Sequence, residues 1–130
     1  MNRTDLSILV VDDVNSMRVQ VREILKSLGF TKVWVSASAD DAIVKLSVDP
    51  VHLIVADWHM PGKSGLELLH FVRANPELEH VAFVFLTGES TRDGVIQAIQ
   101  AGVDDFIIKP ATISQIQAKV FNALIKRNLL

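Results

Sequence analysis

Apolar residues in this chain gather in five short runs, separated by longer segments in which apolar positions recur with helical spacing. The runs are rich in β-branched residues, and most show no alternation with polar residues. Runs of this kind are typical of strands that are buried on both faces of a parallel sheet. The predicted strands cover residues 8–11, 32–35, 53–56, 82–86 and 106–108.

The segments between these runs are predicted to be helices. In the first of them, over residues 17–28, apolar residues recur every three or four positions, and Gly29 follows as a stop signal. Stop signals also follow the third helix at Asn75-Pro76 and the fourth at Gly102. The remaining helices begin at hydroxyl residues, which favour N-cap positions. The expected starts of helices two to five are Ser38, Ser64, Ser90 or Thr91, and Thr112.

Strand and helix therefore alternate five times along the chain. This pattern predicts an α/β fold with a parallel sheet and right-handed crossovers, and residues 1–130 are expected to form one domain. We expect a flavodoxin-like, doubly wound (βα)5 arrangement with strand order 2-1-3-4-5. No residues are expected to remain for a separate output domain.

Composition narrows the function classes. The formal net charge of −2 argues against a nucleic-acid-binding module, which would carry a basic patch. The absence of cysteine excludes disulfides, thiolate zinc sites and cysteine nucleophiles. No apolar stretch is long enough to span a membrane, so we expect a cytoplasmic protein that binds neither nucleic acid nor membrane.

Ionisable and hydroxyl side chains follow four of the five predicted strands. Asp12 and Asp13 follow the first strand, Asp57 the third, Thr87 the fourth and Lys109 the fifth. Ligands of doubly wound sheets bind beyond the carboxyl ends of the strands, where the strand order reverses. With the expected order, the first and third strands are neighbours, and the three carboxylates are predicted to converge.

Three carboxylates without histidine or cysteine form an oxygen site that suits Mg²⁺ or Mn²⁺. A lysine, a hydroxyl and a magnesium ion together can receive the oxygens of a phosphoryl group. Asp57 can then act as a nucleophile that forms an aspartyl-phosphate. Each residue also has an ordinary explanation, because Asp12 or Asp13 alone could cap a helix. The joint placement at one end of the sheet favours the phosphoryl site.

Four motifs, "ILVVDD", "ADWHMPGKSGLELL", "VFLTGES" and "AGVDDFIIKP", carry a family resemblance. In this order and at this spacing they resemble the response regulator receiver domain of two-component signalling. The similarity is greatest to the CheY-like, single-domain members that act in chemotaxis. The resemblance covers nearly the whole chain.

The resemblance implies a metal-dependent phosphoacceptor. Asp57 corresponds to the aspartate that takes a phosphoryl group from a histidine kinase. Asp13 and Asp57 correspond to direct Mg²⁺ ligands, and Asp12 to a residue that acts largely through water. His59 falls where the family supplies a backbone carbonyl to the metal.

The resemblance also implies how the switch works. Thr87 corresponds to the switch hydroxyl, Lys109 to the lysine that pairs with phosphate, and Phe106 to the switch aromatic residue. The Lys109-Pro110 bond is expected to be cis, as in the family. His59 and Glu89 stand at the positions that tune the lifetime of the phosphoryl group.

The partner surface is expected to include the fourth helix. Val95 and Ile99 lie one turn apart and, with Phe106, could form an apolar docking face over the fourth helix, fifth strand and fifth helix. The alternative is that Val95 and Ile99 pack on the sheet, a role for which Ile96 and Ala98 compete. Phe106 lacks the hydroxyl of the chemotaxis tyrosine, which weighs against binding to the flagellar motor.

These observations predict a stand-alone switch that acts by protein contact and is not an enzyme beyond its own phosphorylation and dephosphorylation. Its expected partners are a histidine kinase and a downstream target, with a phosphatase as a further candidate. A single-domain phosphorelay protein is the alternative within this class.

Two alternatives from other classes fit less well. A haloacid-dehalogenase-type phosphatase needs Asp-x-Asp after its first strand and a cap domain, and neither is present. A flavin carrier needs a first loop rich in glycine and hydroxyl residues, whereas this loop is acidic.

Overall fold

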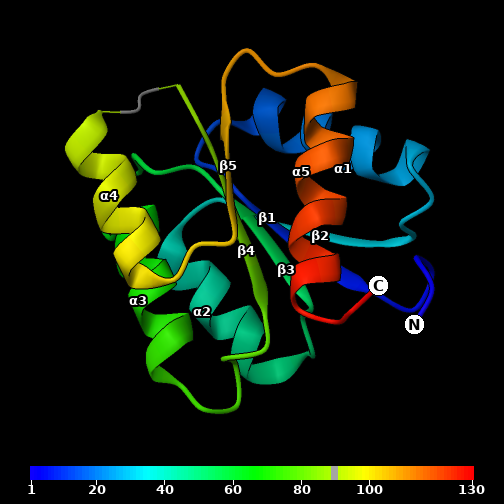
Figure 1. Ribbon diagram of the computed structural model, residues 1–130, viewed down its shortest axis with the longest axis horizontal. Coiled ribbons are helices and arrows are strands. Elements are labelled where there is room, and N and C mark those ends of the chain that lie inside the picture. Colours follow the sequence, from blue (N-terminus) through cyan, green and yellow to red (C-terminus); the bar gives the residue numbers. More distant parts are fainter. Residues whose placement is uncertain (89–90) are drawn as a thin grey trace.

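The computed structural model describes residues 1–88 and 91–130, and a five-stranded parallel sheet forms its centre (Figure 1). The strands lie in the order β2-β1-β3-β4-β5, which confirms the predicted topology. All four neighbouring pairs are parallel. The strands are β1 (Ser7–Val11), β2 (Lys32–Ser36), β3 (Leu53–Ala56), β4 (Ala82–Thr87) and β5 (Asp105–Ile108).

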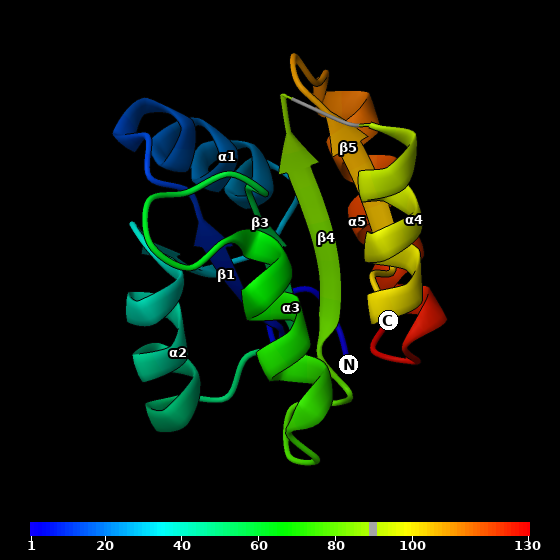
Figure 2. The same ribbon diagram turned by 90° about the vertical axis from the view of Figure 1, so that its left-hand side faces the viewer.

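Five helices cover both faces of this sheet (Figures 1 and 2). One face packs on the first and last helices, and the other on the three helices between them, as the two hydrophobic clusters show. Within the described residues, no helix is long and apolar enough to cross a membrane. The helices are α1 (Asn15–Ser27), α2 (Ala39–Val48), α3 (Gly65–Ala74), α4 (Arg92–Ala101) and α5 (Ile113–Lys126).

The predicted helix boundaries are confirmed by side-chain caps. The hydroxyl oxygens of Ser38, Ser64, Thr91 and Thr112 each accept a hydrogen bond from the backbone N–H three residues later. These bonds satisfy donors that the first turn of a helix leaves unpaired. At the other end of α4, Gly102 adopts φ 95°, a left-handed conformation that favours glycine.

Strand ends differ from the prediction by one residue at several places. β5 begins at Asp105 rather than at Phe106, and β4 includes Thr87. The ladder pairs Thr87 with Ile108 and Asp105 with Val84, so these polar residues are part of the sheet. An apolar pattern stops at the first polar side chain, whereas backbone pairing does not depend on side-chain polarity.

Burial explains why the strand runs lack alternation. Every residue of the three central strands β1, β3 and β4 is buried, because helices cover both faces. The edge strand β2 instead shows exposed residues at alternate positions near its start, and Trp34 is 54% exposed.

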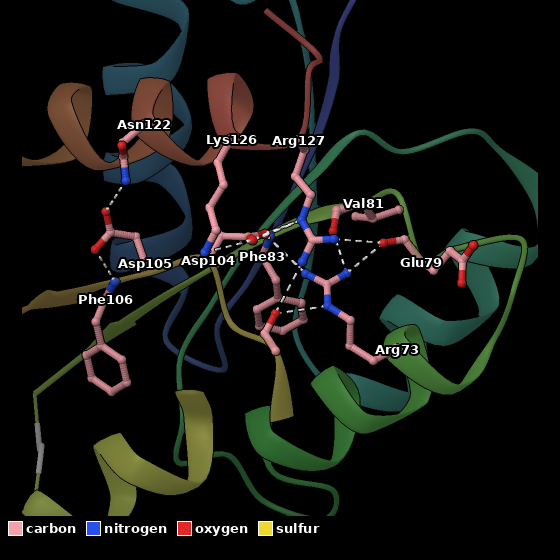
Figure 3. Close-up of polar contacts among 11 residues, drawn as sticks. Arg73, Glu79, Val81, Phe83, Asp104, Asp105, Phe106, Asn122, Lys126 and Arg127 are labelled. Atoms are coloured by element: carbon pink, nitrogen blue, oxygen red, sulfur yellow. Dashed lines mark hydrogen bonds and ion pairs between the residues drawn. The ribbon is translucent and has the colours of Figure 1, made fainter. Parts of the chain in front are cut away.

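A buried ionic network, which the apolar pattern did not reveal, joins three elements at the amino-terminal side of β5 (Figure 3). The fully buried carboxylate of Asp104 accepts hydrogen bonds from Arg73 Nη2 at 3.1 Å and from the backbone N–H of Phe83 at 2.9 Å. Arg127 Nε donates to the same carboxylate at 2.9 Å. Because both arginines share this one carboxylate, loss of Asp104 would leave the partly buried guanidinium of Arg73 without an acidic partner, which costs about 3–5 kcal/mol. The network thus ties α3 and the end of α5 to the sheet.

Candidate functional site

Three carboxylates converge at the carboxyl ends of β1 and β3. Asp12 and Asp13 follow β1, and Asp57 follows β3, where its backbone N–H donates to Val11 O at 2.9 Å. One carboxylate oxygen from each aspartate lies within 4.8 Å of the others. Asp12 is buried, Asp57 is half-buried and Asp13 is exposed. The predicted convergence of the three acids is therefore confirmed.

Helix capping does not explain the adjacent aspartates. The N-cap residue of α1 is Val14, which makes no side-chain cap bond. Asp12 Oδ1 accepts the backbone N–H of Val14 at 2.9 Å, and the Arg18 guanidinium donates to the main-chain oxygen of Asp12 at 2.7 Å. The capping alternative for Asp12 or Asp13 is therefore wrong, because neither residue occupies the cap position.

Lys109 reaches the acids from the end of β5. Its peptide bond to Pro110 is cis, as expected, and its backbone N–H donates to Thr87 O at 2.8 Å. Its ammonium lies 3.0 Å from Asp12 Oδ2 and 3.5 Å from Asp57 Oδ2. One ammonium against three carboxylates leaves two formal negative charges, which a divalent cation complements.

The carboxylate oxygens of the three aspartates are not equally available. Both oxygens of Asp12 are engaged, one by Val14 and one by Lys109. Asp57 Oδ1 accepts the backbone N–H of Trp58 at 2.7 Å, and its Oδ2 is only distantly paired with the lysine. In the part of the chain that the structure describes, the Asp13 carboxylate has neither a hydrogen bond nor an ion pair. The donor set therefore fits a hard divalent cation, with Asp13 and Asp57 the more open ligands.

Thr87 and His59 lie at the same end of the sheet as the three acids. Thr87 is the last residue of β4 and is 1% exposed. His59 is exposed in the loop that follows β3. Glu89 lies outside the described residues.

An aromatic cluster connects this loop to β5. The Trp58 ring lies 4.9 Å from that of Phe85 and 6.0 Å from that of Phe106, and Phe85 and Phe106 are 5.6 Å apart between centroids. Trp58, His59 and Phe106 also line a hollow of about 250 Å³ beside α4. The sequence placed Trp58 beside Asp57, but it gave no sign that Phe85 would join Trp58 to Phe106.

The exposed face of α4 differs in part from the expectation. Ala98 is fully buried and Val95 is half-buried, whereas Ile99 is 64% exposed and Ile96 is 42% exposed. The alternative that Ile99 packs on the sheet is therefore wrong. Ala98 packs against the sheet instead. Since neighbouring residues of a helix point in different directions, Ile99 then faces away from the sheet.

Comparison with known proteins points to a single family. The family model of the response regulator receiver domain matches residues 8–121. The chain is 39% identical to chemotaxis protein CheY of Pseudomonas aeruginosa over 118 residues, which cover 88% of this chain and 93% of that protein. It is 36% identical to chemotaxis protein CheY-3 of Vibrio cholerae serotype O1 over 116 residues, 89% of each chain.

A solved structure has the same fold. The structure of Vibrio cholerae chemotaxis protein CheY4 superposes with a TM-score of 0.86 at 24% identity. The match covers 92% of this chain and 98% of the other.

Proposed function

Because the chain belongs to the response regulator receiver domain family, we propose that it is a phosphoacceptor switch in which Asp57 receives a phosphoryl group from a histidine kinase. The observation that carries this proposal is the cluster of three carboxylates with Lys109 3.5 Å from Asp57 Oδ2. We treat residues 1–130 as a single receiver domain that acts by protein contact. Its only chemistry is its own phosphorylation and dephosphorylation.

The metal in this proposal is Mg²⁺, and Mn²⁺ fits the same oxygen ligands. Asp13 and Asp57 would hold it directly, Asp12 would act through water, and His59 would contribute its backbone carbonyl. When bound, the ion offsets the charge of the acids and of the phosphoryl oxygens. Support for this division comes from Asp12, because Val14 and Lys109 already occupy both of its carboxylate oxygens.

Lys109 and Thr87 would bind the transferred group. The Lys109 ammonium is shared between Asp12 and Asp57 and can move a short distance to pair with a phosphoryl oxygen. The Thr87 hydroxyl would donate a hydrogen bond to another of these oxygens. Thr87 is the last residue of β4 and Lys109 follows β5, so a movement of either side chain would shift the end of its strand. His59 and Glu89 would tune how long the phosphoryl group persists.

Phosphorylation would then change the surface formed by α4, β5 and α5. Thr87 and Phe106 are the switch residues, and Phe106 contacts Trp58, the neighbour of the phosphoacceptor. The exposed Ile99, with Val95 and Phe106, would bind a downstream protein. A ligand shifts such an equilibrium only by its different affinity for the two states, and a phosphoryl group adds both charge and acceptor oxygens.

Chemotaxis is the proposed pathway, because the curated relatives described above are chemotaxis proteins. Phe106 has no hydroxyl, so a target other than the flagellar motor is compatible with the same fold. A single-domain phosphorelay protein is the alternative, and a phosphatase is a further candidate partner.

The proposal is tested with acetyl phosphate and Mg²⁺. Incorporation is followed on a gel that retards acyl-phosphates, with Trp58 fluorescence as a second readout. We expect incorporation in the native protein and in an Asp5→Asn control, and none in Asp57→Asn or in the presence of a chelator. Label that persists in Asp57→Asn, or incorporation that a chelator leaves unchanged, would contradict the assignment.

A further inference from the structure

A second hollow, remote from the three acids, lies against the edge strand β2. Its volume is about 370 Å³, and its walls come from α1, β2 and α2. Among its lining residues, Leu9 and Val51 are buried on the α2 side of the sheet and Val33 is buried on the α1 side, while Trp34 is 54% exposed. We call this hollow the β2 groove. It shares no lining residue with the site around Asp57.

The outer backbone of β2 faces this groove. β2 has a neighbouring strand on one side only, which is β1. Ser36 O accepts the N–H of Asp12 at 3.1 Å and so faces β1. Because carbonyls along a strand point alternately to either side, Val35 O faces away from β1, and Lys45 Nζ from α2 donates to it. A side chain therefore occupies a position where an added strand would place a backbone N–H.

The groove carries positive charge on a chain whose formal net charge is −2. Arg22, Lys26 and Lys45 line it, against the single acid Asp49. Lys45 pairs with Asp41 at 3.1 Å, and Arg22 Nε lies 3.6 Å from Glu23.

Of these cations, Arg22 has an unsatisfied hydrogen-bond donor, and Lys26 has no acidic partner among the described residues. Arg22 Nε is buried and has no hydrogen-bond partner. Lys26 is exposed and makes no ion pair within residues 1–88 and 91–130. The groove therefore has positive charge left to offer a ligand.

We propose that the β2 groove binds an acidic segment of a partner protein in extended conformation, which pairs with β2 as an additional strand. The outward carbonyls of β2 supply the main-chain hydrogen bonds of such a complex. One set of alternate side chains of the segment meets Leu9, Val51 and the Trp34 indole, and the carboxylates of the other set meet Arg22 and Lys26. Lys45 leaves Val35 O and pairs with a carboxylate of the segment. A second copy of this chain fits less well, since a two-fold axis through the edge would bring like charges together.

The test uses the full chain and a capped octapeptide in which valine and glutamate alternate. A peptide with lysine in place of glutamate is the matched control, and binding is followed by amide chemical shifts in ¹⁵N spectra. We expect the acidic peptide to shift the amides of Val33, Trp34 and Val35, and the basic peptide to leave them in place. Equal shifts with both peptides, or none at millimolar peptide, would overturn the proposal.

Matched charge reversals separate the groove from general electrostatics. Lys26→Glu, inside the groove, is expected to weaken binding about tenfold, because attraction is replaced by repulsion. Arg92→Glu on α4 changes the charge by the same amount at an exposed position outside the groove and should leave the affinity within about twofold. Equal losses in both variants would contradict the proposal, and thermal unfolding verifies that both are folded.

The competing possibility is that a second copy of this chain occupies the β2 groove. Lys45→Ala removes the side chain that covers Val35 O, and sedimentation then reports whether the edge pairs with itself. We expect a monomer that still binds the acidic peptide. A concentration-dependent dimer that excludes the peptide would show that the groove is a contact between copies and would overturn the proposal.

Discussion

Asp12 and Asp13 are neighbours in sequence but differ in what their carboxylates can do. Asp12 is buried, and Val14 and Lys109 hold its two oxygens. Asp13 is exposed and free of such bonds within the described residues. Successive residues leave a strand on opposite sides, so two identical side chains enter different surroundings. This difference is what supports a direct metal contact for Asp13 and an indirect one for Asp12.

His52 provides a prediction about pH at the scale of one residue. Its Nδ1 accepts the backbone N–H of Ser7 at 2.9 Å, which requires the neutral ring. Burial lowers the pKa of His52 below its ordinary value of 6.5, with smaller contributions from His80 and Lys32. Since the folded pKa is lower than the unfolded one, this contribution is complete above about pH 6.5 and is lost as the pH falls through the lowered pKa.

His52→Asn keeps an acceptor near this position but cannot be protonated. Between pH 7 and pH 5 the native protein is expected to lose more unfolding free energy than the variant, because protonation of His52 removes the acceptor of the Ser7 N–H. Urea unfolding at a series of pH values measures the difference. Identical pH slopes for the two proteins would show that the bond between Ser7 and His52 does not respond to protonation.

At the scale of elements, the start of α3 packs directly against the backbone of Asp57. Gly65, the first residue of α3, donates its N–H to Trp58 O at 2.8 Å. A Cβ at this position would lie 2.2 Å from the main-chain oxygen of Asp57 and 2.9 Å from the Phe85 ring. The close approach of α3 to the end of β3 therefore depends on the missing side chain.

Gly65→Ala is expected to destabilise the fold by about 1–3 kcal/mol, because the backbone of Asp57 cannot give way without moving the strand end. The same shift should lower phosphorylation by acetyl phosphate. Gly88→Ala is the matched control, since an added Cβ there meets nothing within 4 Å. Urea unfolding compares the two, and equal stabilities would contradict the packing argument.

The exposed face of α4 gives a second prediction at this scale. Ile99→Asp adds a charge to a side chain that is 64% exposed, so it should leave folding and phosphorylation unchanged but weaken contact with a target. Val48→Asp on α2, at a position that is 73% exposed, is the control. A cellular protein retained only by the phosphorylated chain should be lost with Ile99→Asp and kept with Val48→Asp. Retention by both variants would place the contact elsewhere.

For the whole molecule, the proposed metal site would couple Mg²⁺ binding to stability. The mutual repulsion of the three acids opposes folding, and Lys109 is the only cation that forms an ion pair with them within the described residues. A ligand that binds only the folded state stabilises it, by about 2.7 kcal/mol at 100 times its Kd. Magnesium at that level should raise the melting temperature of the native protein relative to sodium chloride of equal ionic strength.

Asp13→Asn should have opposite effects on the stability of the metal-free protein and of the Mg²⁺-bound protein. Without metal the variant should melt higher than the native protein, because one of the repelling charges is gone. With Mg²⁺ its melting temperature should rise little, because a direct ligand is lost. A full Mg²⁺ shift in Asp13→Asn would show that Asp13 does not bind the metal.

The sequence by itself determined the order and type of the elements and the end of the sheet at which chemistry gathers. Apolar spacing is a local property, and polar residues that follow parallel strands must meet at one edge. The sequence alone therefore predicts that Asp12, Asp13, Asp57, Thr87 and Lys109 gather at this end of the sheet. The starts of α2, α3, α4 and α5 were equally readable, since a hydroxyl cap acts on an N–H only three residues away.

Only the tertiary structure decided which of these groups are free and which are engaged. The ion pairs of Lys109, the burial of Asp104 between two arginines and the exposure of Ile99 all join or separate segments far apart in sequence. The β2 groove likewise exists only because α1 and α2 pass on either side of an edge strand. Such features depend on how side chains from distant segments pack, and no local pattern encodes that packing.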